Sequence, residues 1–153
     1  MELSISDWIA IFFGVPTILG LIYTVLSKWY EIRENLKIKK SFGFINYGNK
    51  LSDEYYLFLE CINHGQKTVI LSSCFLKLPD KKTIPAFYRN PLGCNFPYEL
   101  HSGTNFQYLF VDDDLEATLQ KNGYKKNVKL IPVFTTQTGK IFSGKAFDLV
   151  PDA

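Results

Sequence analysis

Arginine, cysteine and tryptophan are scarce in this 153-residue chain, and the first scarcity weighs against whole classes of function. Only two of the 17 basic residues are arginine, which argues against bidentate recognition of phosphate or carboxylate groups. The formal net charge is only +2, and residues 41–153 carry twelve Lys/Arg against eleven Asp/Glu. Such a balance gives no electrostatic footprint for nucleic acid, so no nucleic-acid partner is expected.

The three cysteines are too few and too irregularly spaced for a disulfide framework or a metal site. Cys61, Cys74 and Cys94 form no Cys-x-x-Cys pair, and neither His64 nor His101 stands at metal-ligand spacing from a cysteine. We therefore expect reduced thiols that act as small apolar residues in a reducing compartment. No cofactor and no metal is predicted.

One long apolar run stands near the start of the chain. Residues 8–26 contain no charge over nineteen residues, and a helix of that length spans about 28 Å, close to the thickness of a bilayer core. Trp8 and Trp29 flank the run, and with Tyr30 they are predicted to lie at the membrane interface. The sequence thus predicts a tail over 1–7 and a single transmembrane helix over 8–26, with the lipid bilayer as a partner.

The charges around this run predict its direction. No Lys or Arg precedes it, whereas five follow within residues 27–40, so the C-terminal side is expected to face the cytoplasm. The chain is then a single-pass protein of the inner membrane with its N-terminus outside. We expect residues 27–40 to form a basic helical stalk and residues 41–153 a cytoplasmic domain.

Short alternating runs separated by turn residues make that domain mainly β. Val69 and Leu71 are in phase, but Cys74 and the residues after it follow the opposite phase, which predicts a β-bulge at Ser72–Ser73. One helix interrupts the strands over 113–122. We expect Asp113 to cap its start and Gly123 to close its end.

Turn and cap residues also carry a family resemblance. Their order is Asn63-His64-Gly65, Leu78-Pro79-Asp80, Glu99-Leu100-His101-Ser102-Gly103, Asp113-Asp114-Leu115 and Thr138-Gly139-Lys140. It resembles small immunoglobulin-like β-sandwich proteins of bacteria, which often carry one N-terminal membrane helix and are largely uncharacterised. The resemblance implies an immunoglobulin-like β-sandwich with one short helix after a transmembrane segment. It implies no activity, and the tryptophan typical of antibody domains is missing from residues 41–153.

No catalytic set can be assembled from the sequence. The acidic cluster at 112–116 lacks the spaced ligands and the glycine of a calcium loop, so helix capping explains it better. His64 and His101 both fall in predicted turns, and no Gly-x-Ser-x-Gly elbow or phosphate-binding loop is present. Neither a catalytic residue nor a small-molecule substrate is predicted.

An aromatic-rich loop is the best binding surface that the sequence offers. Phe87, Tyr88, Phe96 and Tyr98 could anchor a protein partner, or they could cover one end of the sandwich core. The leading hypothesis is a membrane-anchored, non-enzymatic interaction module. The alternative is a bacterial or prophage defence, immunity or superinfection-exclusion factor in which the apolar helix is the working part, and an enzyme is the third class.

Overall fold

The computed structural model describes residues 4–46, 48, 50–86, 95–124 and 126–150, with only the backbone given for 5–13 and 31–32. The chain divides into two compact units, residues 1–33 and residues 34–153. The first unit consists of the helix α1 (Ile5–Ile32), which contains Pro16. The second unit is mainly β, and its first strand begins at Leu36, so the predicted helical stalk over 27–40 is part helix and part strand.

The apolar run of the sequence forms α1, but the predicted membrane span is contradicted. Within the part of the chain that the structure describes, no helix is both long enough and apolar enough to cross a bilayer. The prediction of a single-pass transmembrane helix over 8–26 is therefore wrong. That prediction relied on the absence of charge over 8–26 and on the tryptophans at its two ends.

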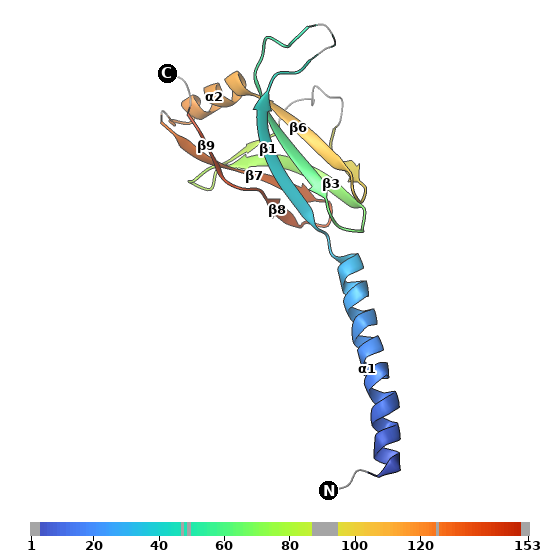
Figure 1. Cartoon of the computed structure of the whole chain (residues 1–153). Coiled ribbons are helices and arrows are strands. Elements are labelled where there is room, and N and C mark those ends of the chain that lie inside the picture. The colour runs from blue at the N-terminus through green and yellow to red at the C-terminus, as the bar shows by residue number, and fades with distance from the viewer. Residues whose placement is uncertain (1–3, 47, 49, 87–94, 125, 151–153) are drawn as a thin grey trace. The chain divides into compact units, whose positions relative to one another are not determined.

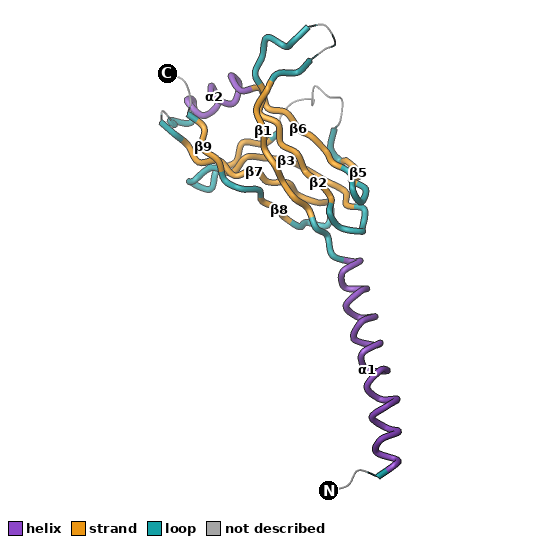
Figure 2. Tube along the Cα trace, in the orientation of Figure 1, coloured by secondary structure: helices purple, strands orange, loops and turns teal. Residues whose placement is uncertain are grey.

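The β unit consists of two antiparallel sheets (Figures 1 and 2). The first has the order β1-β2-β6, with β1 (Leu36–Gly43), β2 (Tyr56–Asn63) and β6 (Asn105–Val111). In the second, the central strands β3 (Val69–Lys77) and β7 (Val128–Thr136) pair with each other. The shorter strands lie at its margins: β4 (Thr83–Pro85) and β5 (Tyr98–Leu100) pair with β3, and β8 (Ile141–Ser143) and β9 (Phe147–Leu149) pair with β7.

This strand arrangement corrects the predicted fold. Among the described strands, none pairs with the outer edge of β6, and β5, which comes just before it in the chain, joins β3 in the other sheet. The helix α2 (Asp112–Lys121) then follows β6 directly. The chain is a mainly β protein with two sheets and two helices, and the more specific prediction of an immunoglobulin-like sandwich is wrong. Of the segments that suggested it, Leu78-Pro79-Asp80 and Thr138-Gly139-Lys140 lie in hairpins, and Asp113-Asp114-Leu115 lies in α2. The other two connect strands of different sheets, so these segments specify local turns and not one sandwich topology.

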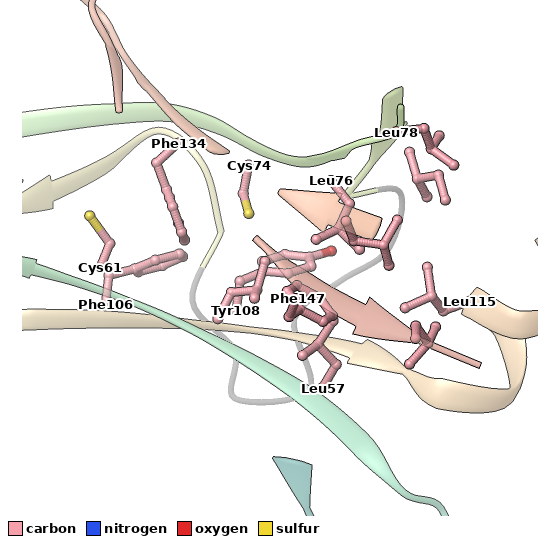
Figure 3. Close-up of a cluster of buried hydrophobic side chains, with 14 of the residues drawn as sticks. Leu57, Cys61, Cys74, Leu76, Leu78, Phe106, Tyr108, Leu115, Phe134 and Phe147 are labelled. Atoms are coloured by element: carbon pink, nitrogen blue, oxygen red, sulfur yellow. The ribbon is translucent and has the colours of Figure 1, made fainter. Parts of the chain in front are cut away.

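The core lies between the sheets and is largely apolar (Figure 3). Alternate residues of β2 face it, since Leu57, Leu59 and Cys61 are each completely buried. Phe106 of β6 and Phe134 of β7 meet across the core edge to face, with ring centroids 6.3 Å apart. Because the two rings come from different sheets, this contact joins the layers directly.

The helix α2 closes one end of this core and differs from prediction at its start. Leu115 and Leu119 are buried, and the apolar face of α2 thereby joins the core. The N-cap residue is Val111, without a side-chain cap, so Asp113 lies within the first turn instead of capping it as predicted. Its carboxylate still favours the positive end of the helix dipole. Gly123 closes the helix as predicted, with φ of 88° and a hydrogen bond from the Tyr124 N–H to the Leu119 carbonyl (3.0 Å).

The predicted bulge in β3 is confirmed. The register with β7 shifts between Leu71 and Ser73, so that Ser72 is an extra residue on the β3 side. The hydroxyls of Ser72 and Ser73 both lie within hydrogen-bonding distance of the Thr135 hydroxyl, at 2.8 and 2.6 Å. The bulge brings the apolar residues on both sides of it to the core face, which explains the change of phase in the sequence.

Glu34 is a buried charge at the start of the β unit. Its side chain is only 4% exposed, and its carboxylate lies 3.5 Å from the ammonium group of Lys140, at the turn between β7 and β8. Since an uncompensated buried carboxylate is costly, this ion pair favours one position for the chain just before β1.

Asn63 is the buried polar residue that joins two connections of the β unit, the β2–β3 turn and the β5–β6 turn. Its amide nitrogen donates to the carbonyls of Lys67 (2.8 Å) and Leu100 (3.0 Å), and its amide oxygen accepts from the N–H of Gly65 (2.9 Å). The side chain is therefore the shared partner of the β2–β3 turn and the end of β5. Its backbone also pairs with Gly103 and Thr104.

We predict that Asn63→Ala lowers the free energy of unfolding by about 2–4 kcal/mol, because it leaves several buried polar groups without partners. Asn105→Ala, which removes one exposed amide bonded to Glu60, is the matched control and should cost less than about 1 kcal/mol. Urea unfolding monitored by circular dichroism measures both. Equal costs would contradict the assigned role of Asn63.

Gly144 lies between side chains of the two sheets, Ile38 of β1 and Pro132 of β7. A Cβ atom there would lie 2.8 Å from Pro132 Cγ and 2.9 Å from Ile38 Cγ2, which is too close for ordinary contact. Gly43 offers a comparison on β1, since a Cβ there would meet only Phe58, at 3.7 Å.

We predict that Gly144→Ala destabilises the β unit by about 1–3 kcal/mol through overpacking, whereas Gly43→Ala costs less than about 1 kcal/mol. The double variant Gly144→Ala with Ile38→Ala should lose less than the sum of the two single costs, since Ile38 supplies one of the close contacts. Thermal unfolding of the four variants is the measurement. Additive costs would show that the Cβ contact with Ile38 is not the cause.

Candidate functional site

The best candidate binding surface is an apolar ledge on the connection between β1 and β2, formed by Phe44, Leu51 and Tyr55. The connection continues the hairpin beyond the paired strands, as Figure 1 shows. The Ser52 N–H donates to the Ile45 carbonyl (2.8 Å), and Leu51 forms an isolated bridge with Asn46. Phe44 and Leu51 therefore both belong to this extension of the hairpin.

Aromatic contacts extend this ledge from the core to the surface. Tyr55 stacks on Phe42 with ring centroids 6.1 Å apart and an interplanar angle of 9°, and Phe44 lies 5.0 Å from Tyr55. Phe42 in turn meets Phe147 of β9 edge to face at 6.1 Å. The inner rings are half-buried or buried, whereas Phe44 is 54% exposed, Leu51 62% and Tyr55 40%. The ledge is therefore held in place by the core and open to solvent.

Carboxylates lie near the ledge on two sides. Asp53 and Glu54 precede Tyr55 directly, and both are exposed, but the Glu54 carboxylate accepts a hydrogen bond from the Tyr56 hydroxyl and so lies on the face opposite to Tyr55. On the other side, the Asp112 N–H donates to the Tyr55 carbonyl (2.9 Å), so the acidic first turn of α2 begins beside Tyr55. That turn adds the exposed Asp113 and Asp114, followed by Glu116.

Two lysines belong to the same region. Lys40 Nζ lies 4.8 Å from the ring centre of Phe42 and 4.6 Å from that of Phe147, which occupies it in cation–π contacts. Lys50 is exposed on the hairpin next to Leu51. Lys37 and Lys39 of β1 alternate with Lys40 and so lie on the opposite face of the strand. With five carboxylates against two ammonium groups, the side of the ledge is acidic, in contrast to the chain as a whole.

The predicted partner-binding aromatics fall into two groups. Phe87 and Tyr88 lie outside the described residues. Phe96 and Tyr98 are half-buried and pack on the core, with ring centroids 5.1 Å and 4.6 Å from that of Phe106. Both residues thus have a clear packing role, and partner binding by them stays a prediction.

The residues predicted at a membrane interface lie on α1. Trp29 is 60% exposed and Tyr30 61%, and the guanidinium carbon of Arg33 lies 5.3 Å from the Trp29 ring centre. Trp8 lies on the helix, but its side chain lies outside the described part. Between residues 15 and 30, α1 exposes large apolar side chains, namely Val15, Ile18, Leu19, Leu21, Ile22, Tyr23, Val25, Leu26, Trp29 and Tyr30.

The residues weighed for catalysis are dispersed or structurally occupied. His101 Nδ1 lies 3.2 Å from the Thr68 hydroxyl at the surface, and His64 is exposed in the β2–β3 turn. The described residues contain no group of three or more His, Cys, Asp or Glu that could hold a metal ion. Asp80 accepts a hydrogen bond from Tyr124, which lowers the pKa of Asp80 and raises that of Tyr124.

The two described cysteines are free, buried and chemically protected. Burial, with a smaller effect from the charge of Glu60, raises the pKa of Cys61 from 9.0 to about 12. Burial, followed by the neighbouring Cys61, raises the pKa of Cys74 well above 9.0. Because thiolates are the reactive form, neither cysteine is suited to nucleophilic chemistry in the folded chain.

We predict that in a Cys94→Ser variant, Cys61 and Cys74 react with DTNB at least about a hundredfold more slowly in the native than in the denatured chain. The unfolded thiols ionise near pH 9.0 and Cys61 in the fold only near 12, so the free energy of unfolding should fall as pH rises through this interval. Labelling of the native chain at the denatured rate, or a flat stability profile there, would contradict the buried placement.

The ledge is the surface that the sequence reasoning missed. The available signal was the alternation of Phe42 and Phe44 past the end of the strand, with Tyr55 returning from the turn. The sequence predicts strands over Lys37–Asn46 and Tyr55–Asn63, with a turn that begins at Tyr47-Gly48-Asn49 between them. In that prediction Phe42, Phe44 and Tyr55 are strand residues and form no surface of their own. Their exposure depends on where the second sheet stops, which local sequence does not encode.

Comparisons with known proteins support no family assignment. No protein-family model and no curated protein matches the chain. Among solved structures, a Bordetella pertussis protein provisionally named ApaA is similar at 11% identity and a TM-score of 0.38, over 76% of this chain and 94% of that one. The structural genomics target SoR45 is similar at the same identity and TM-score, over 75% of this chain and 85% of that one. Likeness at this level carries no functional argument.

Proposed function

We propose that this chain is a non-enzymatic interaction module whose β unit binds a protein partner through the ledge of Phe44, Leu51 and Tyr55. The observation that carries the proposal is the exposure of these three large apolar side chains on one hairpin. Contiguous exposed apolar residues with polar residues around them are typical of protein-binding surfaces. Aromatic anchors among them supply much of the binding energy in such interfaces.

The rigidity of the ledge supports the same function. Tyr55 is held by stacking on Phe42 and by the backbone hydrogen bond from Asp112, so little conformational entropy remains to be lost when a partner binds. The chemistry of the described side chains agrees, because the buried cysteines are protonated and the histidines lie in separate surface turns. Two free buried thiols also suit a reducing compartment, in which we place the β unit.

A second candidate function rests on α1. Ten large apolar side chains of residues 15–30 are each at least half exposed, and a helix that is apolar around its circumference favours burial against other apolar groups. In this alternative, α1 is the working element and the β unit regulates or positions it. Replacing residues 5–32 by an unrelated helix separates the two functions: activity that survives the exchange favours the β unit.

We predict that the full chain, used as bait in its native host, captures a partner that the double variant Phe44→Ser/Tyr55→Ser no longer retains. Ile141→Ser, which removes a 67% exposed residue from β8, is the matched control and should retain it. Quantitative mass spectrometry of the three captures is the measurement, and circular dichroism confirms that each variant is folded. Repeated capture of no protein that depends on Phe44 and Tyr55 would overturn the proposed function.

A further inference from the structure

From the charges around the ledge we infer the chemistry of its occupant: a basic amphipathic segment of a partner protein, in which apolar side chains alternate with lysine or arginine. This inference rests on the proposed function and specifies its partner. It requires that apolar and acidic groups form one continuous surface, and Tyr55 provides that continuity.

Tyr55 lies at the centre of the surface. On one side its ring contacts Phe42 and Phe44, and through Phe42 it connects to Phe147 of the core. On the other side its carbonyl accepts the Asp112 N–H at 2.9 Å, where α2 begins. An occupant that covers the exposed edge of Tyr55 therefore comes close to the first turn of α2 and to Asp53, which lies two residues before Tyr55 in the chain.

The charges of this region favour an occupant with basic side chains. Asp53 and the carboxylates of residues 112–116 give five negative charges. Lys37 and Lys39 of β1 alternate with Lys40 and so lie on the other face of the strand, which leaves Lys40 and the hairpin residue Lys50 as the lysines near the ledge. Of these, Lys40 already lies over two rings of the core margin. An acidic partner would add negative charge beside these carboxylates, and a neutral one would gain nothing from them.

The exposed rings indicate that the occupant also carries apolar side chains. Aliphatic side chains can pack on the edges and faces of Phe44 and Tyr55. The ring faces are electron-rich, so they also attract the guanidinium or ammonium groups that would pair with the carboxylates. A second copy of this chain fits less well, because its own ledge carries the same charges, and like-charged surfaces repel.

The decisive experiment measures binding of paired synthetic peptides to the full chain by fluorescence anisotropy. Each pair consists of a peptide of about a dozen residues in which Leu alternates with Lys, and its counterpart with Glu at every Lys position. We expect the Lys peptide to bind at least about tenfold more tightly than the Glu peptide at low salt. Its affinity should fall when the ionic strength is raised, because exposed charges are screened.

Two variants locate the site. Phe44→Ser should weaken binding of the Lys peptide about tenfold or more, whereas Ile141→Ser on β8 leaves it unchanged. The double neutralisation Asp53→Asn/Asp113→Asn should weaken it and reduce its salt dependence, whereas Glu99→Gln, an exposed carboxylate on β5, should change neither. Melting temperatures measured alongside separate a lost contact from a lost fold.

Four results would overturn the inference: no binding of the Lys peptide, equal binding of the Glu peptide, insensitivity to Asp53→Asn/Asp113→Asn, or dimers of the chain that Phe44→Ser dissociates. None of them by itself removes the proposed function. A host partner that is lost on Phe44→Ser/Tyr55→Ser but kept on Asp53→Asn/Asp113→Asn would sustain the interaction module and refute the basic occupant. A host partner that both variants retain would refute the proposed function.

Discussion

The β unit depends on the contact between its two sheets, and the rings of Phe106 and Phe134 form the centre of that contact. Each sheet alone has one apolar face, and a sheet of three strands with such a face exposed is only marginally stable in water. Packing the two faces together removes Leu57, Leu59 and Cys61 from solvent on one side and Leu71, Cys74 and Leu76 on the other. Two polar contacts at the edge of the core connect segments of the two sheets. Asn63 of β2 bonds to Leu100 of β5, and Glu34, just before β1, pairs with Lys140, just before β8.

The exposed position of the ledge follows from where the contact between the two sheets ends. The first sheet extends past the second on the β1–β2 side, so the face that carries Leu57 and Leu59 continues to Tyr55 and Phe44 without a facing layer. The alternation that buries residues inside the sandwich therefore exposes them beyond it. Phe147 and Lys40 close the core margin beneath, through ring contacts with Phe42. The ledge is thus an uncovered continuation of the core, which makes it both rigid and apolar.

Local patterns in the sequence reveal some of this structure and conceal the rest. The bulge at Ser72–Ser73 and the closing glycine of α2 were predictable, because a phase change in alternation and a Gly after a helix have local causes. The placement of β5 beside β3 was not, because strand partners far apart in the chain are chosen by packing. Asp113 was misassigned as a cap because the residue before the helix, Val111, has no capping side chain and β6 runs directly into α2. The membrane prediction used only the absence of charge and the flanking tryptophans, and no helix of the described residues is long and apolar enough to span a bilayer.

The placement of charge near the ledge is best understood as a compromise between folding and binding. Three acidic residues in the first turn of α2 stabilise a helix that has no side-chain cap, since they face the positive end of its dipole. The same residues repel one another, and the exposed Asp53 on the neighbouring hairpin adds to the negative charge of this side. Distributing these carboxylates over the chain would relieve the repulsion, and one capping residue at position 111 could replace their effect on the helix. Helix stability accounts for the charges on α2, and the hydrogen bond from the Tyr56 hydroxyl accounts for Glu54, so Asp53 is the hairpin charge for which the proposed basic partner supplies a reason.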